Sequence, residues 1–299
     1  VYSPVTGKQW YAMTAFTEQA PDDGPGVAFV KLPDLDGDGI EEFAGGNSSA
    51  SLTKETYAGG RIVLYAGRTG SSLWVRWGTT RLGTLGALMV LSGDHNGDDY
   101  PDIITREALP RGRGIGQRVE EIDSVVEVIS GRTGELLETH YAPTPYHFLF
   151  GFAIASLGDW DANGFPELAI SAPYYREGPV PFKGVDDSDG RFRGWVGVYK
   201  LPSFELVYST TGRDPKINTF NGDNLGLQAS PAGDADGDGT TDLLAAAPRD
   251  APLTPYPFGR LYLFSGKDGS VLQTYAALQD EFTAAFEYLS PLGDVDGDG

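Results

Sequence analysis

The most informative stretch of the sequence reads Asp234-Ala235-Asp236-Gly237-Asp238-Gly239-Thr240-Thr241-Asp242, with acidic residues at positions 1, 3, 5 and 9 of a short turn. Carboxylates within about 4 Å of one another repel by about 4 kcal/mol per pair at an effective dielectric constant of about 20. Such a turn is therefore compact only around a cation. Ca²⁺ suits it, because this ion takes six to eight oxygen ligands in irregular geometry, and the carbonyl at position 7 supplies one more.

The same spacing recurs along the chain, with loops that begin at residues 34, 94, 159, 234 and 294. A repeat of 60 to 75 residues is typical of propeller and solenoid architectures. The fifth copy is cut short because the sequence ends at Gly299. The predicted calcium ligands are the side chains of Asp34, Asp36, Asp38, Glu42, Asp94, Asn96, Asp98, Asp102, Asp159, Asp161, Asn163, Glu167, Asp234, Asp236, Asp238, Asp242, Asp294, Asp296 and Asp298, and the carbonyls of Ile40, Tyr100, Phe165 and Thr240.

Short apolar segments flank each complete loop, as in Leu88–Leu91 before the second loop and Asp102–Ile104 after it. A second pair surrounds a glycine turn such as Gly67-Arg68-Thr69-Gly70, where the last glycine suits a bulged hairpin. One repeat is thus strand A, calcium loop, strand B, connection, strand C, turn and strand D. This order predicts an all-β β-propeller of four-stranded antiparallel blades. We expect one domain over 1–299, with repeats at 1–16 (partial), 26–80, 84–142, 148–212, 222–278 and 282–299 (partial).

Up-and-down strand order places the A–B loops and C–D turns at one end of each blade and the B–C connections at the other. The expected connections are 47–60, 106–124, 172–194 and 247–259. Arginines and aromatic residues on exposed loops are typical of contact surfaces, although packing between blades also uses them. The residues in question are Tyr57, Arg111, Arg113, Arg118, Tyr174, Tyr175, Arg176, Phe182, Tyr256 and Phe258.

The chain resembles the FG-GAP repeat family, the calcium-loop propeller repeat that also occurs in integrin alpha head domains. The resemblance rests on Phe150-Gly151 with Ala172-Pro173, and on Leu225-Gly226 with Ala246-Ala247-Pro248. It implies calcium-binding blades, seven of them if the sequence is part of a longer chain. It also implies an extracellular or cell-surface adhesion, matrix or assembly module that binds protein or glycan. The alternative is an accessory propeller of a larger secreted hydrolase or lyase.

Composition narrows the class of protein. The net charge of −20 disfavours nucleic acid, whose phosphates require a basic face. No apolar run is long enough for a membrane helix. Zero cysteines exclude disulfides and thiolate chemistry. The first residues of the sequence show no signal peptide. The lack of an initiator Met is consistent with the removal of one. Calcium loops of modest affinity fill where calcium is millimolar, which favours an extracellular location.

Rival readings fit the motifs less well. EF-hands and dockerin modules need a carboxylate near position 12, where this chain has Gly45, Thr105, Ile170 and Ala245. Acidic turns without metal do not explain four equal spacings. A quinone enzyme would need a tryptophan spacing that only Trp74 satisfies. We expect no enzyme activity, because the three histidines form no catalytic or metal signature; His95, at position 2, is expected to be solvated. Asp99, at position 6 where glycine is usual, predicts a distorted second loop.

Overall fold

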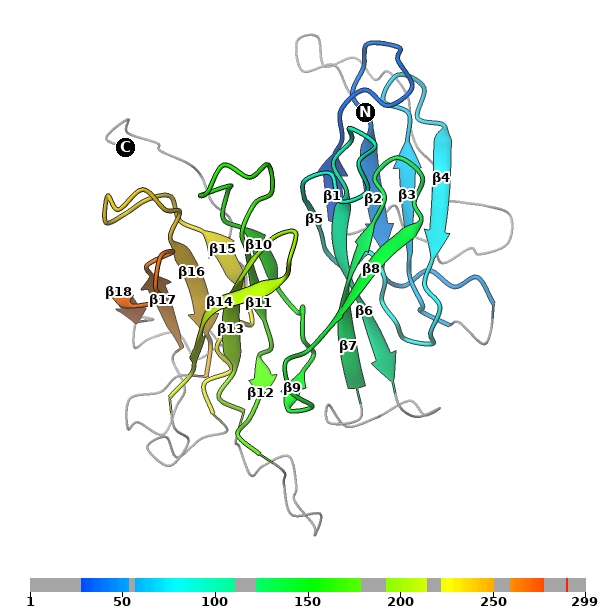
Figure 1. Cartoon of the computed structure of the whole chain (residues 1–299). Coiled ribbons are helices and arrows are strands. Elements are labelled where there is room, and N and C mark those ends of the chain that lie inside the picture. Colours follow the sequence, from blue (N-terminus) through cyan, green and yellow to red (C-terminus); the bar gives the residue numbers. More distant parts are fainter. Residues whose placement is uncertain are drawn as a thin grey trace. The chain divides into compact units, whose positions relative to one another are not determined.

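The computed structural model describes residues 28–53, 57–110, 122–178, 192–213, 222–249, 259–276 and 289. Within these residues the chain forms strands, turns and loops but no helix. The strands make four four-stranded antiparallel sheets and one two-stranded sheet (Figure 1). The predicted all-β fold, a β-propeller of four-stranded antiparallel blades, is confirmed. No segment of the described chain forms a helix with the length and apolar character that a bilayer crossing requires.

The chain divides into two compact units, Val1–Tyr141 and Ala142–Gly299. The first holds two blades, each with its strands in sequence order across the sheet. Blade 1 consists of β1 (Ala28–Lys31), β2 (Phe43–Asn47), β3 (Arg61–Tyr65) and β4 (Ser72–Trp77), and blade 2 of β5 (Met89–Leu91), β6 (Ile103–Pro110), β7 (Ile122–Ile129) and β8 (Leu136–Tyr141).

The second unit also holds two blades and, in addition, the two-stranded sheet of β9 (His147–Phe148) and β12 (Tyr174–Tyr175). This small sheet was not predicted. Blade 3 consists of β10 (Ile154–Ser156), β11 (Leu168–Ser171), β13 (Trp195–Lys200) and β14 (Glu205–Thr211), and blade 4 of β15 (Ala229–Pro231), β16 (Leu243–Ala247), β17 (Arg260–Phe264) and β18 (Val271–Ala276).

The core of each unit is built from the inner strands of its blades. In the first unit Leu32, Ile62, Ile103 and Ile129 belong to one buried cluster, which draws on blades 1 and 2. In the second unit the corresponding cluster draws on blades 3 and 4. Strands B and C are more buried than strand D, as in β16 and β18 of blade 4. Burial on both faces explains the mostly apolar sequences of strands such as β11 and β16.

Strand C of every blade carries a register shift just before the C–D turn. In blades 1, 2 and 4 the turn ends on a glycine with positive φ, namely Gly70, Gly134 and Gly269. This confirms the bulged hairpins predicted from the glycine spacing. The turn of blade 3 lacks the glycine and was expected to differ, but Phe204 stands at the closing position with a φ of 52°, so a left-handed residue ends this turn too.

An aromatic residue on strand D ties neighbouring blades together within each unit. Trp74 donates its indole N–H to the carbonyl of Gly131 in the next C–D turn, at 3.1 Å. Tyr208 donates its hydroxyl to the carbonyl of Ser265 in the same way, at 3.0 Å. A Cβ atom on Gly134 or Gly269 would lie 2.7 or 2.6 Å from these rings, so the turn glycine is required. Packing between blades therefore accounts for Trp74.

The Phe-Gly and Ala-Pro elements of the repeat are joined by one hydrogen bond. The N–H of Gly151 donates to the carbonyl of Ser171 at 2.8 Å, and that of Gly226 donates to the carbonyl of Ala246 at 2.9 Å. Both glycines have positive φ, 80° and 87°. The dipeptide thus turns the chain into strand A and fixes it to the end of strand B.

The connection predicted over 106–124 is shorter than expected, because β6 runs to Pro110 and β7 begins at Ile122. That predicted range includes Arg106 and Glu107. Both residues are buried. Glu107 accepts hydrogen bonds from the backbone and hydroxyl groups of Thr79 and Thr80.

Several other predictions lie outside the described residues: the partial repeats 1–16 and 282–299, the fifth loop with Asp294, Asp296 and Asp298, and Arg111, Arg113, Arg118, Phe182, Tyr256 and Phe258.

Candidate calcium sites

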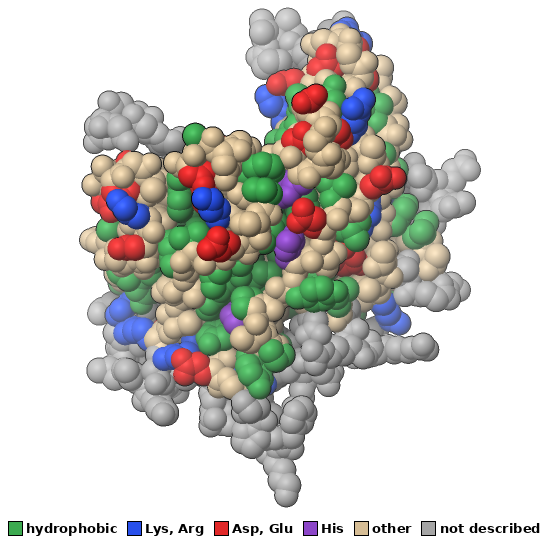
Figure 2. Space-filling model, in the orientation of Figure 1, with side chains coloured by type: hydrophobic (Ala, Val, Ile, Leu, Met, Phe, Trp, Pro, Cys, Tyr) green, Lys and Arg blue, Asp and Glu red, His purple; other side chains and the backbone are tan. Residues whose placement is uncertain are grey.

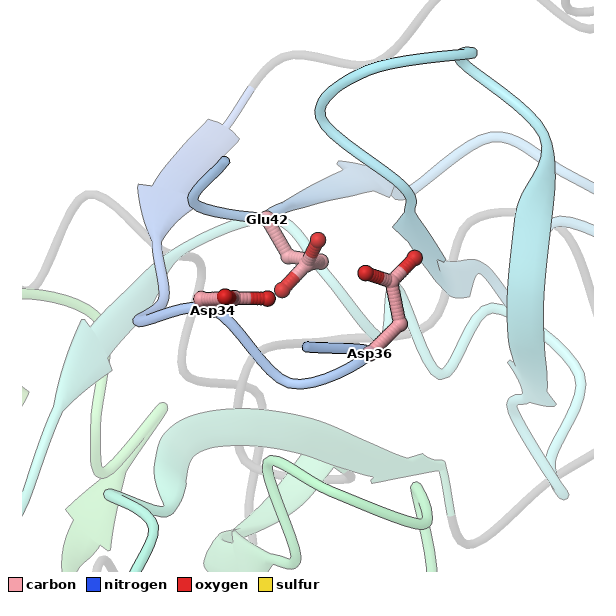
Figure 3. Close-up of side chains that lie close together, drawn as sticks. All are labelled: Asp34, Asp36 and Glu42. Atoms are coloured by element: carbon pink, nitrogen blue, oxygen red, sulfur yellow. The ribbon is translucent and has the colours of Figure 1, made fainter. Parts of the chain in front are cut away.

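The first A–B loop brings three carboxylates together. Figure 3 shows the side chains of Asp34, Asp36 and Glu42 pointing toward one another from the loop between β1 and β2. One carboxylate oxygen from each lies within 4.8 Å of the others, and Asp234, Asp236 and Asp242 form the same arrangement in the fourth loop. In the unit of blades 1 and 2, red acidic side chains in Figure 2 gather near the end where Figure 1 draws the A–B loops.

The aspartate at position 1 shapes each loop. Its Oδ2 accepts the N–H at position 6 in all four loops, at 2.7 to 2.9 Å, and its Oδ1 accepts the N–H at position 5. These bonds wrap the turn around one carboxylate. In the second loop desolvation acts in the opposite direction, but the N–H groups of Asp99, Asp98, Gly97 and Asn96 hold the pKa of Asp94 below its usual value.

The carboxylate at position 9 joins the loop to its own start. It accepts the backbone N–H of position 2 in every described loop: Leu35 to Glu42, His95 to Asp102, Trp160 to Glu167 and Ala235 to Asp242, at 2.5, 2.7, 2.9 and 2.8 Å. All four acids are buried. The recurring bond explains why position 9 is acidic in each loop.

In blades 2 and 4 position 9 also holds the C–D turn. The second oxygen of Asp102 accepts the N–H of Gly131 at 3.2 Å, and that of Asp242 accepts the N–H of Gly266 at 2.9 Å. These glycines have no room for a side chain, because a Cβ atom would lie 2.1 Å from the carbonyl of Pro101 or Thr241. A buried aspartate therefore links the A–B loop with the C–D turn at the same end of the blade.

The residues fit a hard cation. Oε1 of Glu42 is buried without a hydrogen-bond partner, although buried carboxylate oxygens are normally satisfied. Desolvation and the charges of Asp238, Asp242 and Asp234 raise the pKa of Asp236. Both features are relieved by a positive ion inside the loop. Ca²⁺, which accepts six to eight oxygens at 2.3 to 2.6 Å, matches a donor set made only of carboxylate, amide and carbonyl oxygens.

The loops are not equivalent. Among the described residues, clusters of three acidic ligand atoms form in the first and fourth loops but not in the second and third. Asn96 and Asn163 replace an acid in the latter pair. Asn163 donates its amide N–H to the carbonyl of Leu201 at 2.9 Å, which leaves its oxygen for the loop. Asp38 and Asp238 share loops with the clusters but lie outside them. Ligation by Ile40, Tyr100, Phe165 and Thr240 stays a prediction.

The second loop is not distorted, contrary to expectation. Asp99 adopts a φ of 70° and donates its N–H to Asp94 at 2.7 Å, as glycine does at position 6 of the other loops. Aspartate tolerates this left-handed region, so the loop keeps its shape with some strain.

Replacing Asp99 with glycine is therefore expected to raise the free energy of unfolding by about 1 kcal/mol. Ala162 in the third loop has a φ of 55°, where the other loops have glycine at position 4, so A162G should give a similar gain. Urea denaturation in saturating calcium measures both. A162S, which keeps a side chain at this φ, is the control; an equal gain from A162S would reject strain as the cause.

His95 is not solvated, which corrects the sequence interpretation. Its side chain is 1% exposed, with Nε2 at 2.5 Å from the Ser92 hydroxyl and Nδ1 at 3.5 Å from Glu138. The hydrogen bond from position 2 to position 9 turns the side chain inward, and Leu35 and Trp160 pack against the core from the same position. Glu138 also contacts Nε2 of His140 at 2.8 Å.

His147 lies away from the loops, between the rings of Tyr175 and Trp195 at centroid distances of 4.5 and 4.7 Å. Burial lowers its pKa to about 4. His147 is therefore protonated near pH 6.5 in the unfolded chain but only near pH 4 in the folded chain. The contribution of neutral His147 to the free energy of unfolding is fully present above pH 6.5. It is lost as the pH falls toward 4, by up to about 3 kcal/mol.

This loss is measured as the difference between the wild type and H147Q in urea denaturation from pH 7 to 4, with calcium saturating. The wild type should lose more stability than H147Q over this range. Parallel profiles would show that another group causes the acid sensitivity.

Comparison with known proteins identifies relatives of this chain. Residues 226–264 match the FG-GAP repeat model. The chain is 29% identical over 220 residues to integrin alpha-V from Gallus gallus, which covers 73% of this chain and 19% of that protein. It is 30% identical over 155 residues to integrin alpha-PS2 from Drosophila melanogaster, covering 46% of this chain and 11% of that protein. The chain thus spans less than a fifth of the length of these relatives.

Solved structures show weaker likeness. Saccharomyces cerevisiae Sqt1 is 10% identical, with a TM-score of 0.48 over 90% of this chain and 52% of that one. The exotype rhamnogalacturonan lyase YesX is 16% identical, with a TM-score of 0.43 over 86% of this chain and 52% of that one. Likeness at this level carries no conclusion about function.

Proposed function

We propose that this chain, an FG-GAP repeat domain similar to the N-terminal domain of integrin alpha chains, is a calcium-stabilised adhesion-type module that works outside the cell. It binds a protein ligand through the B–C connections of its blades. The observation that carries the proposal is the pairing of each A–B loop with its C–D turn, as in the bond from Gly266 to Asp242. Calcium-loop contacts occupy that end of each blade, which leaves the B–C end for a partner.

Calcium has a structural role in this proposal. Each complete loop binds one ion through positions 1, 3, 5, 7 and 9, and the partial fifth loop contributes through Asp294, Asp296 and Asp298. The ion removes the repulsion between clustered carboxylates and holds strand A to strand B. Extracellular calcium, at millimolar concentration, fills sites of modest affinity. The proposal includes no catalytic step, and the division into repeats within one domain stays a prediction.

The B–C connection of blade 1 offers contact residues. Leu52 and Tyr57 are 55% and 54% exposed, unlike the buried residues of β2 and β3 beside them. The guanidinium of Arg81 lies over the ring of Tyr57, 5.8 Å from its centroid. An exposed tyrosine held by an arginine is typical of protein-binding surfaces, in which both residue types are enriched.

The connection of blade 3 is anchored at both ends. Tyr174 and Tyr175 form β12 and pair with β9, and Phe192 packs on Phe148 and Tyr174 at centroid distances of 6.4 and 5.3 Å. These contacts stabilise the fold. An exchange limited to residues 179–191 keeps Tyr174, Tyr175 and Phe192, whereas a change over the whole of 174–193 would remove β12.

The test measures binding to a panel of purified extracellular matrix proteins in millimolar calcium. Tyr57→Ala, Leu52→Ala and replacement of 179–191 by a Gly-Ser linker should each reduce binding at least about tenfold and leave the melting temperature unchanged. The control is Leu73→Ala, which removes a similarly exposed leucine from strand β4. Undiminished binding by all three variants, or equal loss in the control, would reject the B–C connections as binding segments.

A further inference from the structure

A basic residue of the C–D turn contacts the first calcium loop. Arg68, in the turn between β3 and β4, donates from Nε to Oδ2 of Asp38 at 2.9 Å and from Nη2 to the carbonyl of Asp38 at 2.7 Å. The other carboxylate oxygen of Asp38 accepts the N–H of Ile40 at 2.8 Å. Asp38 is the acid at position 5, yet the cluster of this loop contains only Asp34, Asp36 and Glu42. Arg68 thus occupies an oxygen of a predicted calcium ligand.

The third loop repeats this arrangement with another residue. Lys200, the last residue of β13, forms an ion pair with Asp161 at position 3. The hydrogen bond from Lys200 lowers the pKa of Asp161 and raises the pKa of Lys200. In this described loop the acids do not assemble into a cluster of three. Again a cationic side chain contacts one of the predicted acidic ligands of the loop.

The second loop provides an internal comparison. Arg132 occupies the turn position that Arg68 has in blade 1, but its guanidinium lies over the ring of Tyr100, 5.0 Å from the centroid. Asp98, at position 5, instead accepts hydrogen bonds from the amide of Asn96 and the N–H of Tyr100. The turn cation is therefore present in both blades but contacts a loop acid in only one.

We propose that Arg68 and Lys200 compete with calcium for Asp38 and Asp161, so that each lowers the calcium affinity of its loop and stabilises the loop when calcium is absent. The inference rests on the proposed calcium binding. A calcium ion that takes Asp38 as a ligand must displace the guanidinium or bind beside its positive charge, and both weaken binding. Without calcium the same charge offsets the repulsion among the clustered carboxylates.

Two effects of opposite sign follow from removing the charge. Arg68→Gln should tighten calcium binding at the first loop by about tenfold, which is the effect of one unit charge near a divalent ion at an exposed site. In EGTA the same variant should melt about 2 °C below the wild type, because an exposed ion pair contributes little. Arg68→Lys keeps the charge and should stay within about threefold of the wild-type affinity.

Calorimetric titration with calcium chloride and melting curves in EGTA measure these effects on the whole chain. Arg132→Gln is the matched control and should change neither quantity. Lys200→Gln should behave as Arg68→Gln does, at the third loop. Combining Arg68→Gln with Asp34→Ala, which disables the first loop, should abolish the gain in affinity and so assign it to that site.

The outcomes separate this inference from the proposed function. If the wild type binds no calcium, the calcium proposal and the inference both fail. If the wild type binds calcium and Arg68→Gln weakens the affinity or leaves it unchanged, only the inference fails. Weaker binding would show that Arg68 positions Asp38 as a ligand. A similar gain in Arg132→Gln would show that the effect arises from net charge alone.

Discussion

Removal of calcium with EGTA is expected to lower the melting temperature by more than about 10 °C. A site at a hundredfold excess of calcium over its dissociation constant stabilises the folded state by about 2.7 kcal/mol. Four such sites would rival the whole free energy of unfolding of an ordinary domain, about 5 to 15 kcal/mol. Differential scanning calorimetry in calcium and in EGTA measures the shift.

Magnesium at the same concentration is the control and should restore little of the loss, because this smaller ion requires near-octahedral geometry and gives up its water reluctantly. Equal melting temperatures in calcium and EGTA would contradict a structural role for the ion. Full recovery in magnesium would mean that ionic charge alone, without a shaped site, stabilises the loops.

The second large effect is expected at position 9 of the fourth loop. Asp242 is fully buried and accepts the N–H groups of Ala235 and Gly266 at 2.8 and 2.9 Å. Asp242→Ala removes a calcium ligand and leaves two buried donors unpaired, which should cost about 4 to 6 kcal/mol in calcium. In EGTA about 2 to 3 kcal/mol of this loss should persist, because the unpaired donors remain.

Asp236→Ala in the same loop is the matched comparison. Asp236 is exposed and belongs to the same carboxylate cluster. Its replacement should destabilise the chain in calcium but not in EGTA, where losing one acid relieves repulsion. Urea denaturation under both conditions distinguishes the variants. Equal behaviour in EGTA would show that the bonds of Asp242 to the loop and turn contribute nothing beyond calcium binding.

The repeated features of the fold were predictable from the sequence. Acidic spacing such as Asp234 to Asp242, with apolar segments on both sides, indicated the A–B hairpins and the four-stranded blades. The turn glycines, including Gly70, indicated the bulged C–D hairpins. These features depend on local backbone geometry, which residue type and spacing determine within a few positions.

Features that depend on contacts between distant segments were missed. The predicted connection 106–124 included Arg106 and Glu107, but Glu107 accepts hydrogen bonds from Thr79 and Thr80, in the segment between β4 and β5. The inward direction of His95 follows from the bond between positions 2 and 9, which spacing alone does not reveal. A basic residue in the C–D turn, such as Arg68, or at the end of strand C, such as Lys200, was a usable signal for contact with the calcium loop, although its partner differs from blade to blade.

The proposed role of the A–B loops depends on calcium binding by their acidic positions. An anomalous difference map from crystals grown in calcium chloride tests it most directly. We expect one strong peak in each of the four described loops, about 2.3 to 2.6 Å from oxygens of positions 1, 3, 5, 7 and 9. Density no stronger than water between Asp234, Asp236 and Asp242, or peaks farther than about 3 Å from the carboxylates, would contradict it.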